Sequence, residues 1–308
     1  MKRVLVTGGT GFIGRWALDP LVARGFEVHA VSSRPPRTSQ SSVQWHEGNL
    51  LASGEPSRLI AAIRPTHVLH FAWSAPPGLF WTTPENVDWV AATLALARAF
   101  EQHGGQRFVG AGSGAEYARS DEDCDERTTA LEPATLYGTC KLAAHRVVEA
   151  FARGRFSSAW GRIFHLYGPH EDRSRLVPAV IRALLEGRDA ECTAGTQVRD
   201  FMHVSDVAGA FVALLDSDVE GAVNIASGRP VRLADVIASI GAALNAPDRI
   251  RLGARPIPAG EFPRVTASVV RLRDEVGWSA ARDLDRGLAE TIAWWRTQAP
   301  ASPSPSGQ

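Results

Sequence analysis

Three glycines that follow the first apolar run constrain the fold of this chain more than any other feature. The segment Val4-Leu5-Val6 has the composition of a buried strand and continues directly into Thr7-Gly8-Gly9-Thr10-Gly11-Phe12-Ile13-Gly14. Glycine lacks a Cβ, so a glycine-rich turn lets backbone N–H groups approach an anion, and the positive end of a following helix adds to the attraction. This spacing between a strand and a helix is typical of dinucleotide-binding folds. We therefore predict a dinucleotide site formed by Gly8, Gly11, Phe12, Ile13 and Gly14; the alternative is a purely structural turn.

Short apolar runs alternate with helical patterns along the first half of the chain. We predict strands at 4–6, 28–32, 68–72 and 107–111, and helices at 11–24, 85–103 and 135–152. Such alternation favours an α/β fold with a Rossmann-type, doubly wound parallel sheet. Beyond residue 165, helical patterns at 176–186, 204–216, 233–244 and 284–296 are separated by short extended runs. We expect a dinucleotide-binding domain at 1–165 with a return near 197–226, and a smaller, partly interleaved C-terminal substrate domain at 166–296.

Composition excludes several classes of protein. The 308 residues hold 33 basic and 33 acidic side chains, which argues against a nucleic-acid-binding protein. Three scattered cysteines are too few for a disulfide framework or a zinc site, so we expect no metal. No apolar run is long enough to span a membrane, and the first strand leaves no room for a signal peptide, so we expect a soluble, cytoplasmic protein. The Ser- and Pro-rich end, 297–308, is expected to be disordered.

The end of the second predicted strand bears on which dinucleotide binds. Chains that bind NAD usually carry an acidic residue there, which holds the ribose 2′-hydroxyl. This chain carries Ser32-Ser33-Arg34 instead, and two hydroxyls with a guanidinium suit a 2′-phosphate. We therefore predict a preference for NADP, with NAD as the alternative if this segment is only a solvated turn.

A tyrosine and a lysine one helical turn apart are the main candidates for chemistry. Tyr137-Gly-Thr-Cys-Lys141 opens a helical pattern, so both side chains share one face. Only Lys2 and Lys141 are lysine among the 33 basic residues, so Lys141 stands out in an arginine-rich chain. We predict that the ammonium, with an oxidised nicotinamide, lowers the pKa of the phenol toward neutrality, so that the phenol can transfer a proton. Ser113 follows a predicted strand and could hydrogen-bond the reacting oxygen.

With these motifs the chain resembles an extended short-chain dehydrogenase/reductase of the nucleotide-sugar epimerase, dehydratase and 4-ketoreductase family. The resemblance implies that Ser113, Tyr137 and Lys141 form the catalytic set. It also implies that Arg199 contacts the diphosphate of a nucleotide-sugar substrate, that Glu261 holds its nucleotide ribose, and that the protein is a homodimer. The remaining cofactor contacts that we expect are Asn49, Leu50, Phe71, Ala72 and Trp73.

Departures from the family pattern reduce the number of reactions that this chain could catalyse. Dehydratases of the family carry Asp-Glu directly after the catalytic Ser or Thr, and this chain has Gly114 and Ala115 there. An epimerase-reductase of the family pairs a cysteine, here Ala115, with a histidine, here His170. The family's substrate-binding asparagine is replaced by His165. Gly114 and Ala115 argue against 4,6-dehydration, and Ala115 also argues against C3/C5 epimerisation.

Tryptophans surround the proline-rich stretch 75–84. Trp73 and Trp81 could form a wall over the sugar together with Trp89, or all three could be ordinary core residues. For substrate contacts we therefore predict Trp73, Trp81, Ser113, His165, His170, Arg199 and Glu261.

Three functions fit the sequence. The leading hypothesis is NADPH-dependent reduction of the 4-keto group of a nucleotide-linked 6-deoxy sugar, with Tyr137 as the acid. The alternative is an NAD-dependent nucleotide-sugar 4-epimerase, which needs the same three side chains. A non-catalytic dinucleotide-binding or RNA-binding relative is a third possibility, because a fold does not determine a function; the Tyr137–Lys141 pair and the balanced charge argue against it.

Overall fold

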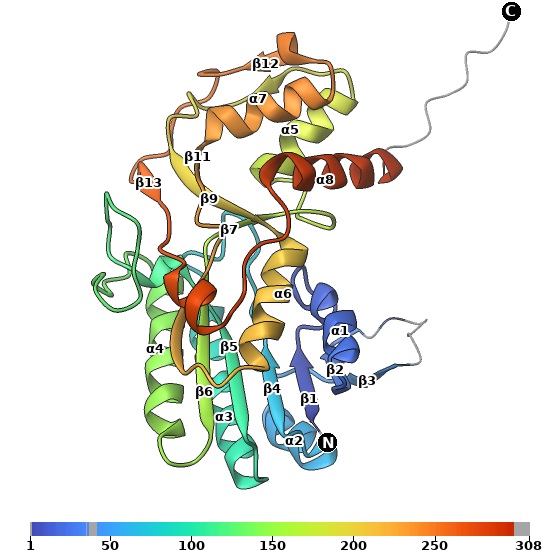
Figure 1. Ribbon diagram of the computed structural model, residues 1–308, viewed down its shortest axis with the longest axis vertical. Coiled ribbons are helices and arrows are strands. Elements are labelled where there is room, and N and C mark those ends of the chain that lie inside the picture. Colours follow the sequence, from blue (N-terminus) through green and yellow to red (C-terminus); the bar gives the residue numbers. More distant parts are fainter. Residues whose placement is uncertain (1, 35, 37–41, 299–308) are drawn as a thin grey trace, which may run out of the picture.

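Seven parallel strands form the central sheet of the protein, which we describe from a computed structural model covering residues 2–34, 36 and 42–298 (Figure 1). The strand order is β10-β6-β5-β4-β1-β2-β3, so the order reverses direction between β1 and β4. The strands are β1 (Arg3–Thr7), β2 (Glu27–Ser32), β3 (Val43–Glu47), β4 (His67–His70), β5 (Arg107–Ser113), β6 (Ser157–Ile163) and β10 (Gly221–Ile225). This arrangement confirms the predicted doubly wound α/β fold.

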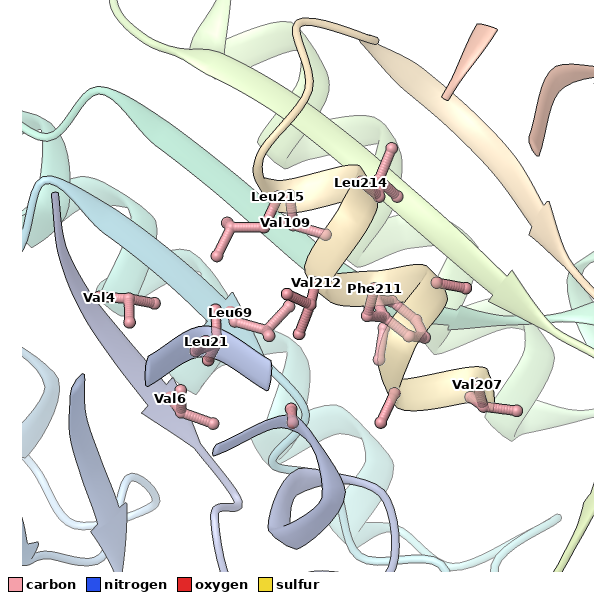
Figure 2. Close-up of a cluster of buried hydrophobic side chains, with 14 of the residues drawn as sticks. Val4, Val6, Leu21, Leu69, Val109, Val207, Phe211, Val212, Leu214 and Leu215 are labelled. Atoms are coloured by element: carbon pink, nitrogen blue, oxygen red, sulfur yellow. The ribbon is translucent and has the colours of Figure 1, made fainter. Parts of the chain in front are cut away.

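Helices cover both faces of this sheet because successive side chains of each strand point to opposite sides. Val4 and Val6 of β1 pack under α1 and α6, whereas Leu5 belongs to the core under α2, α3 and α4. Figure 2 shows Phe211 and Val212 of α6 in one apolar cluster with Leu69 of β4 and Val109 of β5. The helices are α1 (Gly14–Ala23), α2 (Glu55–Ile63), α3 (Glu85–Gln102), α4 (Leu136–Ala152) and α6 (Val204–Leu215).

A smaller set of elements lies above the strand ends (Figure 1). Strand β9 pairs with β7, β11 and β13, while β8 pairs with β12. A separate apolar core joins the helices of this part, with Ile181, Ile237 and Ile292 among its buried members. The elements are β7 (His165–Tyr167), β8 (Ala190–Glu191), β9 (Val198–His203), β11 (Pro230–Arg232), β12 (Ile250–Arg251), β13 (Arg264–Val265), α5 (Leu176–Leu185), α7 (Leu233–Ala243) and α8 (Leu284–Gln298).

After residue 165, β10 pairs with β6 at the edge of the large sheet and α6 packs against that sheet, whereas β9, which precedes α6, belongs to the upper part. We propose that this return, predicted near 197–226, belongs to the cofactor-binding part. We propose that the division at residue 165 separates a cofactor-binding part from a substrate-binding part.

Several predicted boundaries differ from the structure. The first helix begins at Gly14 rather than at Gly11, because the Gly11 N–H donates to the Gly8 carbonyl in a turn, 2.8 Å away. The strand predicted at 68–72 ends at His70. The sequence analysis gives no residue ranges for strands β3, β6 and β10 or for helix α2. Helix α8 continues to Gln298, and the rest of the predicted disordered tail lies outside the described residues.

Candidate active site

The glycine turn lies at the carboxyl end of β1, where the strand order reverses. Gly8 has a φ of +69°, and a Cβ there would lie 2.9 Å from the backbone nitrogen of Ala72. A Cβ at Gly14 would lie 2.2 Å from the carbonyl oxygen of Gly8. The turn therefore requires glycine at both positions, and it leads from β1 directly into the N-terminus of α1. Phe12 and Ile13 lie between the turn and α1, where a pyrophosphate could accept hydrogen bonds from backbone N–H groups.

Ser32, Ser33 and Arg34 follow at the end of β2. The hydroxyls of Ser32 and Thr10 are 2.8 Å apart, and the Arg34 N–H donates to Ser32 Oγ at 3.1 Å. Ser32 is thus tied to the glycine turn, whereas the side chains of Ser33 and Arg34 are exposed. The structure places all three beside the turn, and it leaves Ser33 and Arg34 available to a ligand.

The other expected cofactor residues differ in exposure. Asn49 is exposed, whereas Leu50 is buried in the core beneath α2 and α3. Phe71 packs against α6, and the Ala72 N–H donates to Thr7 Oγ1 at 3.1 Å. Asn49 is therefore the member of this group whose side chain is presented to solvent.

Tyr137 and Lys141 lie one turn apart at the start of α4, as predicted. The Thr135 side chain caps this helix by accepting from the Gly138 N–H. Lys141 is only 4% exposed, and its Nζ donates to the Ala111 carbonyl of β5 at 2.8 Å. Ser113 ends β5, and its side chain is close enough to the Tyr137 phenol to lower the pKa of that phenol. The structure therefore brings the three predicted catalytic side chains together at the carboxyl end of β5.

Three aromatic rings, Trp73, Phe80 and Trp81, form an aromatic cluster around Tyr137. Each meets the Tyr137 ring edge-on, with centroids 6.4, 4.8 and 5.9 Å away. The ammonium of Lys141 lies 3.8 Å from the centroid of the Trp73 ring. The structure therefore places Trp73, Trp81 and Phe80 against Tyr137, and the wall over a sugar stays a prediction.

Burial dominates the electrostatics of this pair in the protein alone. Burial raises the pKa of Tyr137 to about 12, although the Ser113 side chain opposes the rise. Burial also lowers the pKa of Lys141 to about 7. Thus, in the protein alone, Lys141 does not bring the pKa of the phenol toward neutrality. The physical reason is geometric: Nζ faces Trp73 and the Ala111 carbonyl and lies 5.9 Å from the Tyr137 ring centroid.

His165 begins β7, close to two cationic side chains. Burial, reinforced by Arg199 and Arg175, lowers the pKa of His165 to about 3, so the ring is neutral. Its Nδ1 is buried and has no hydrogen-bond partner among the described residues. Arg175 precedes α5, with its guanidinium 5.3 Å from the Phe80 centroid. This corner therefore offers positive charge and an unused hydrogen-bonding atom.

Arg199 and Glu261, both predicted to bind substrate, form an ion pair. Arg199 Nη2 lies 2.9 Å from Glu261 Oε1 and also donates to the Phe262 carbonyl. The Arg199 side chain is 5% exposed and that of Glu261 is 29% exposed. The carboxylate thus holds the guanidinium in place while keeping one edge accessible to solvent.

His170 is the predicted residue that the structure does not bring to the catalytic set. It has a φ of +71°, and its ring packs against Trp294 of α8, with centroids 4.6 Å apart. Burial, with a contribution from Arg15, lowers its pKa. These contacts place His170 beside α8 and α1, and none in the described part of the chain links it to Tyr137.

Sequence reasoning missed four residues of this region. Glu116 lies directly beneath Ser113, and the pattern Ser113-x-x-Glu116 of a capping box could have revealed it. Phe80 and Arg175 had no such signal. Burial raises the pKa of Glu171 to about 8, and its Oε2 has no hydrogen-bond partner among the described residues.

Within 2–34, 36 and 42–298, no group of three or more His, Cys, Asp or Glu side chains could hold a metal ion. In the same ranges, the helices are all too short or too polar to cross a lipid bilayer.

The sheet order, the glycine turn and the Tyr137–Lys141 pair together define an extended short-chain dehydrogenase/reductase. The chain belongs to the NAD dependent epimerase/dehydratase family, whose family model matches residues 4–226. It is therefore an enzyme of that family.

Comparison with known proteins supports this assignment. The chain is 25% identical to a UDP-glucose 4-epimerase of Neisseria meningitidis serogroup C, over 96% of this chain and 97% of that protein. It is also 25% identical to the dTDP-D-glucose 4,6-dehydratase of Mus musculus, over 96% and 89% of the two chains. Among solved structures, MoeE5 in complex with UDP-glucuronic acid and NAD is 32% identical, with a TM-score of 0.82 and coverage of 96% and 100%. The UDP-glucose 4-epimerase of Thermotoga maritima shares the fold, with a TM-score of 0.87, 22% identity and coverage of 96% and 99%.

Proposed function

We propose that this enzyme is an NAD-dependent nucleotide-sugar 4-epimerase. The observation that carries the proposal is the grouping of Ser113, Tyr137 and Lys141 at the carboxyl end of β5, with Gly114 and Ala115 adding no acid or base of their own. Moving one proton to and from a sugar hydroxyl needs only one such group, whereas elimination of water needs more. The similarity to UDP-glucose 4-epimerases and to MoeE5 favours this function over the 4-ketoreductase.

The residues at the glycine turn fit a dinucleotide, because the backbone packs too closely for a Cβ at Gly8 or Gly14 and leads directly to the α1 N-terminus, where N–H groups can meet a pyrophosphate. In this proposal Gly11, Phe12 and Ile13 border the pyrophosphate, and Lys141 faces the nicotinamide ribose. When NAD is bound, its nicotinamide supplies the acceptor and the donor of the hydride that leaves and re-enters C4 of the sugar.

Tyr137 carries the proton in the proposed reaction. Its phenol oxygen takes a proton from the sugar 4-hydroxyl and later returns it, while the Ser113 hydroxyl orients the sugar oxygen. Burial alone holds the pKa of Tyr137 near 12, so the positive charge of an oxidised nicotinamide must act with Lys141 to lower it. The low pKa of Tyr137 is thereby confined to the complex with oxidised nicotinamide, in which the sugar 4-hydroxyl gives up its proton.

Substrate binding is assigned to the corner between β7, α5 and β9. Arg199 and Arg175 supply positive charge for a nucleoside diphosphate, and the neutral His165 offers Nδ1 as a hydrogen-bonding atom. Glu261 holds Arg199 and presents its carboxylate to a ribose hydroxyl. The aromatic cluster would then pack against the apolar face of the sugar.

The test is to incubate the purified enzyme with UDP-glucose or UDP-glucuronic acid and to follow the sugar by NMR. A 4-epimerase converts each accepted substrate to a mixture of C4 epimers without net change in absorbance at the NADH wavelength. The Tyr137→Phe variant should give no product. Stoichiometric oxidation of NADPH with a 4-keto sugar, and no epimer from any nucleotide sugar, would overturn the proposal.

A specific observation keeps the NADPH-dependent 4-ketoreductase as a second candidate. No acidic residue follows β2, where exposed Ser33 and Arg34 suit a 2′-phosphate. Releasing the cofactor from the purified enzyme by heat and identifying it by mass spectrometry separates the two functions. Bound NAD supports the epimerase, whereas exchangeable NADP supports the reductase.

We also propose that the enzyme is a homodimer that pairs through α3 and α4. Val87 of α3 and Val147 of α4 are 56% and 47% exposed, as apolar side chains at a subunit contact would be in an isolated chain. Light scattering after size-exclusion chromatography tests this, and a monomer at micromolar concentration would contradict it.

A further inference from the structure

The buried carboxylate of Glu116 lies immediately beneath the catalytic set, and the proposed reaction does not use it. The side chain is 0% exposed. Its Oε1 accepts from the Ser113 N–H at 2.9 Å and from Trp160 Nε1 at 3.0 Å, while Oε2 accepts from Arg162 Nε at 2.8 Å. With both oxygens occupied and no solvent access, Glu116 cannot touch a substrate. Its effect must be transmitted through its neighbours.

The surrounding chain is shaped to hold this carboxylate. A Cβ at Gly112 would lie 2.5 Å from Glu116 Oε1 and 2.2 Å from Trp160 Nε1, so only glycine leaves room for both. His145 stacks on the Trp160 ring with an interplanar angle of 7°, and its Nδ1 lies 3.8 Å from Glu116 Oε2. A buried charge is costly unless it is paired and hydrogen-bonded, and this site meets both conditions.

One hydrogen-bonded contact and one electrostatic effect connect Glu116 to the catalytic set. The first is the capping box, in which Ser113 Oγ accepts from the Ala115 N–H while the Glu116 carboxylate accepts from the Ser113 N–H. This fixes both the backbone and the hydroxyl of Ser113. The second is electrostatic: the charge of Glu116 raises the pKa of Lys141 and so opposes the effect of burial.

We propose that Glu116 is a positioning residue that fixes the turn carrying Ser113, and that its negative charge also acts on the Lys141 ammonium. The inference rests on the proposed function for its catalytic meaning. The effect of the Glu116 charge on Lys141 can be measured without any substrate.

The test uses the fact that Lys2 and Lys141 are the only lysines. Protein labelled with ¹³C at lysine Cε gives two lysine signals, and the Lys141 signal is identified by its loss in Lys141→Arg. In Glu116→Gln, the pH midpoint of Lys141 should fall by roughly half to one unit, as expected when a neighbouring opposite charge is removed. The kcat should fall about tenfold with little change in KM, because Ser113 is displaced.

A matched control is Asp206→Asn, which breaks a buried ion pair with Arg282 elsewhere in the fold. It should lower stability without moving the Lys141 midpoint. Because Glu116→Gln leaves the Arg162 guanidinium without its carboxylate, Glu116→Gln/Arg162→Met is measured if the single variant does not fold. In the double variant kcat alone decides, because one charge of each sign is removed. An unchanged kcat in a folded Glu116 variant, or an unchanged Lys141 midpoint in Glu116→Gln, overturns the proposal. If the wild type turns over no nucleotide sugar, the proposed function fails, while the titration still decides whether the Glu116 charge acts on Lys141.

Discussion

The Lys141 ammonium lies 3.8 Å from the centroid of the Trp73 ring, in a buried cation–π contact. The Trp73 indole is held in turn by a hydrogen bond from Nε1 to Asn86 Oδ1, 2.9 Å long. The negative face of the ring partly replaces the water that the ammonium loses on burial. Trp73 therefore helps to keep Lys141 charged, although burial still lowers the lysine pKa to about 7.

Replacing Trp73 should lower the pKa of Lys141 further. A cation–π contact of about 1–2 kcal/mol corresponds to about one pH unit, so the Lys141 midpoint should fall by about that much in Trp73→Leu. Trp73→Phe keeps an aromatic face and should shift it less. The ¹³C titration of the two lysines measures both variants. Equal midpoints in the wild type and in Trp73→Leu would show that the ring does not stabilise the ammonium.

Tyr137→Phe should abolish catalysis while leaving the fold intact. Loss of a general acid–base group typically costs 10²–10⁴-fold in rate, so kcat should fall by about that factor. Tyr117→Phe is the matched control, because the Tyr117 hydroxyl donates to Asn224 Oδ1 away from the catalytic set. It should lower stability by about 1 kcal/mol and keep kcat. Steady-state kinetics with circular dichroism checks both, and a fully active Tyr137→Phe enzyme would refute the assigned role.

Arg34 should decide how strongly the enzyme binds a 2′-phosphate. Its side chain is exposed beside the glycine turn, so Arg34→Ala should weaken NADPH binding about tenfold and leave NADH binding nearly unchanged. Fluorescence titration with each nucleotide gives the two dissociation constants. If both nucleotides lose affinity equally, or neither does, Arg34 does not recognise the phosphate.

Arg199→Gln should raise KM for the nucleotide sugar more than it lowers kcat. The guanidinium makes charge-assisted hydrogen bonds worth about 1.5–3 kcal/mol each, so the loss should be roughly 10- to 100-fold in KM. Arg127→Gln, which breaks an exposed ion pair with Glu275, serves as the control and should leave KM unchanged. A KM that stays constant in Arg199→Gln would remove Arg199 from the binding site.

Glu171 should make the protein less stable as pH rises. Burial raises the pKa of its carboxyl from 4.5 to about 8, so the folded state holds a proton that the unfolded state has lost. Stability from this group is therefore lost progressively as pH rises from about 4.5 to about 8. Glu171→Gln should flatten the curve of Tm against pH in that window, whereas Glu122→Gln at an exposed position should not. Parallel wild-type and Glu171→Gln curves would exclude this role.

The parts of the site that depend on local sequence could be predicted. Gly8 and Gly14 are required by a turn that spans only seven residues, and Tyr137 and Lys141 share a face because both lie in one helix. Their conformations follow from the residues beside them. The pattern of the sequence was therefore sufficient for the parallel, doubly wound sheet, for the glycine turn and for the shared helix face of Tyr137 and Lys141.

The parts that depend on distant contacts could not be predicted. Phe80 reaches Tyr137 from a loop far earlier in the chain, and no periodicity encodes that approach. The positive φ of His170, which brings its ring to Trp294 of α8, has no local pattern either. Burial raises the pKa of Tyr137 in the protein alone, and the lowering by an oxidised nicotinamide with Lys141 stays a prediction.

The return of α6 and β10 to the large sheet affects how this chain can fold during synthesis. Phe211 and Leu215 of α6 cover the sheet residues beneath them (Figure 2), and the Arg107 guanidinium of β5 donates to the carbonyl of Leu215 at 3.0 Å. A gene fragment ending at residue 165 would lack this helix and the strand beside β6, leaving apolar surface and a bare strand edge in water. The chain must therefore be synthesised as far as Ile225, the end of β10, before the large sheet can be completed.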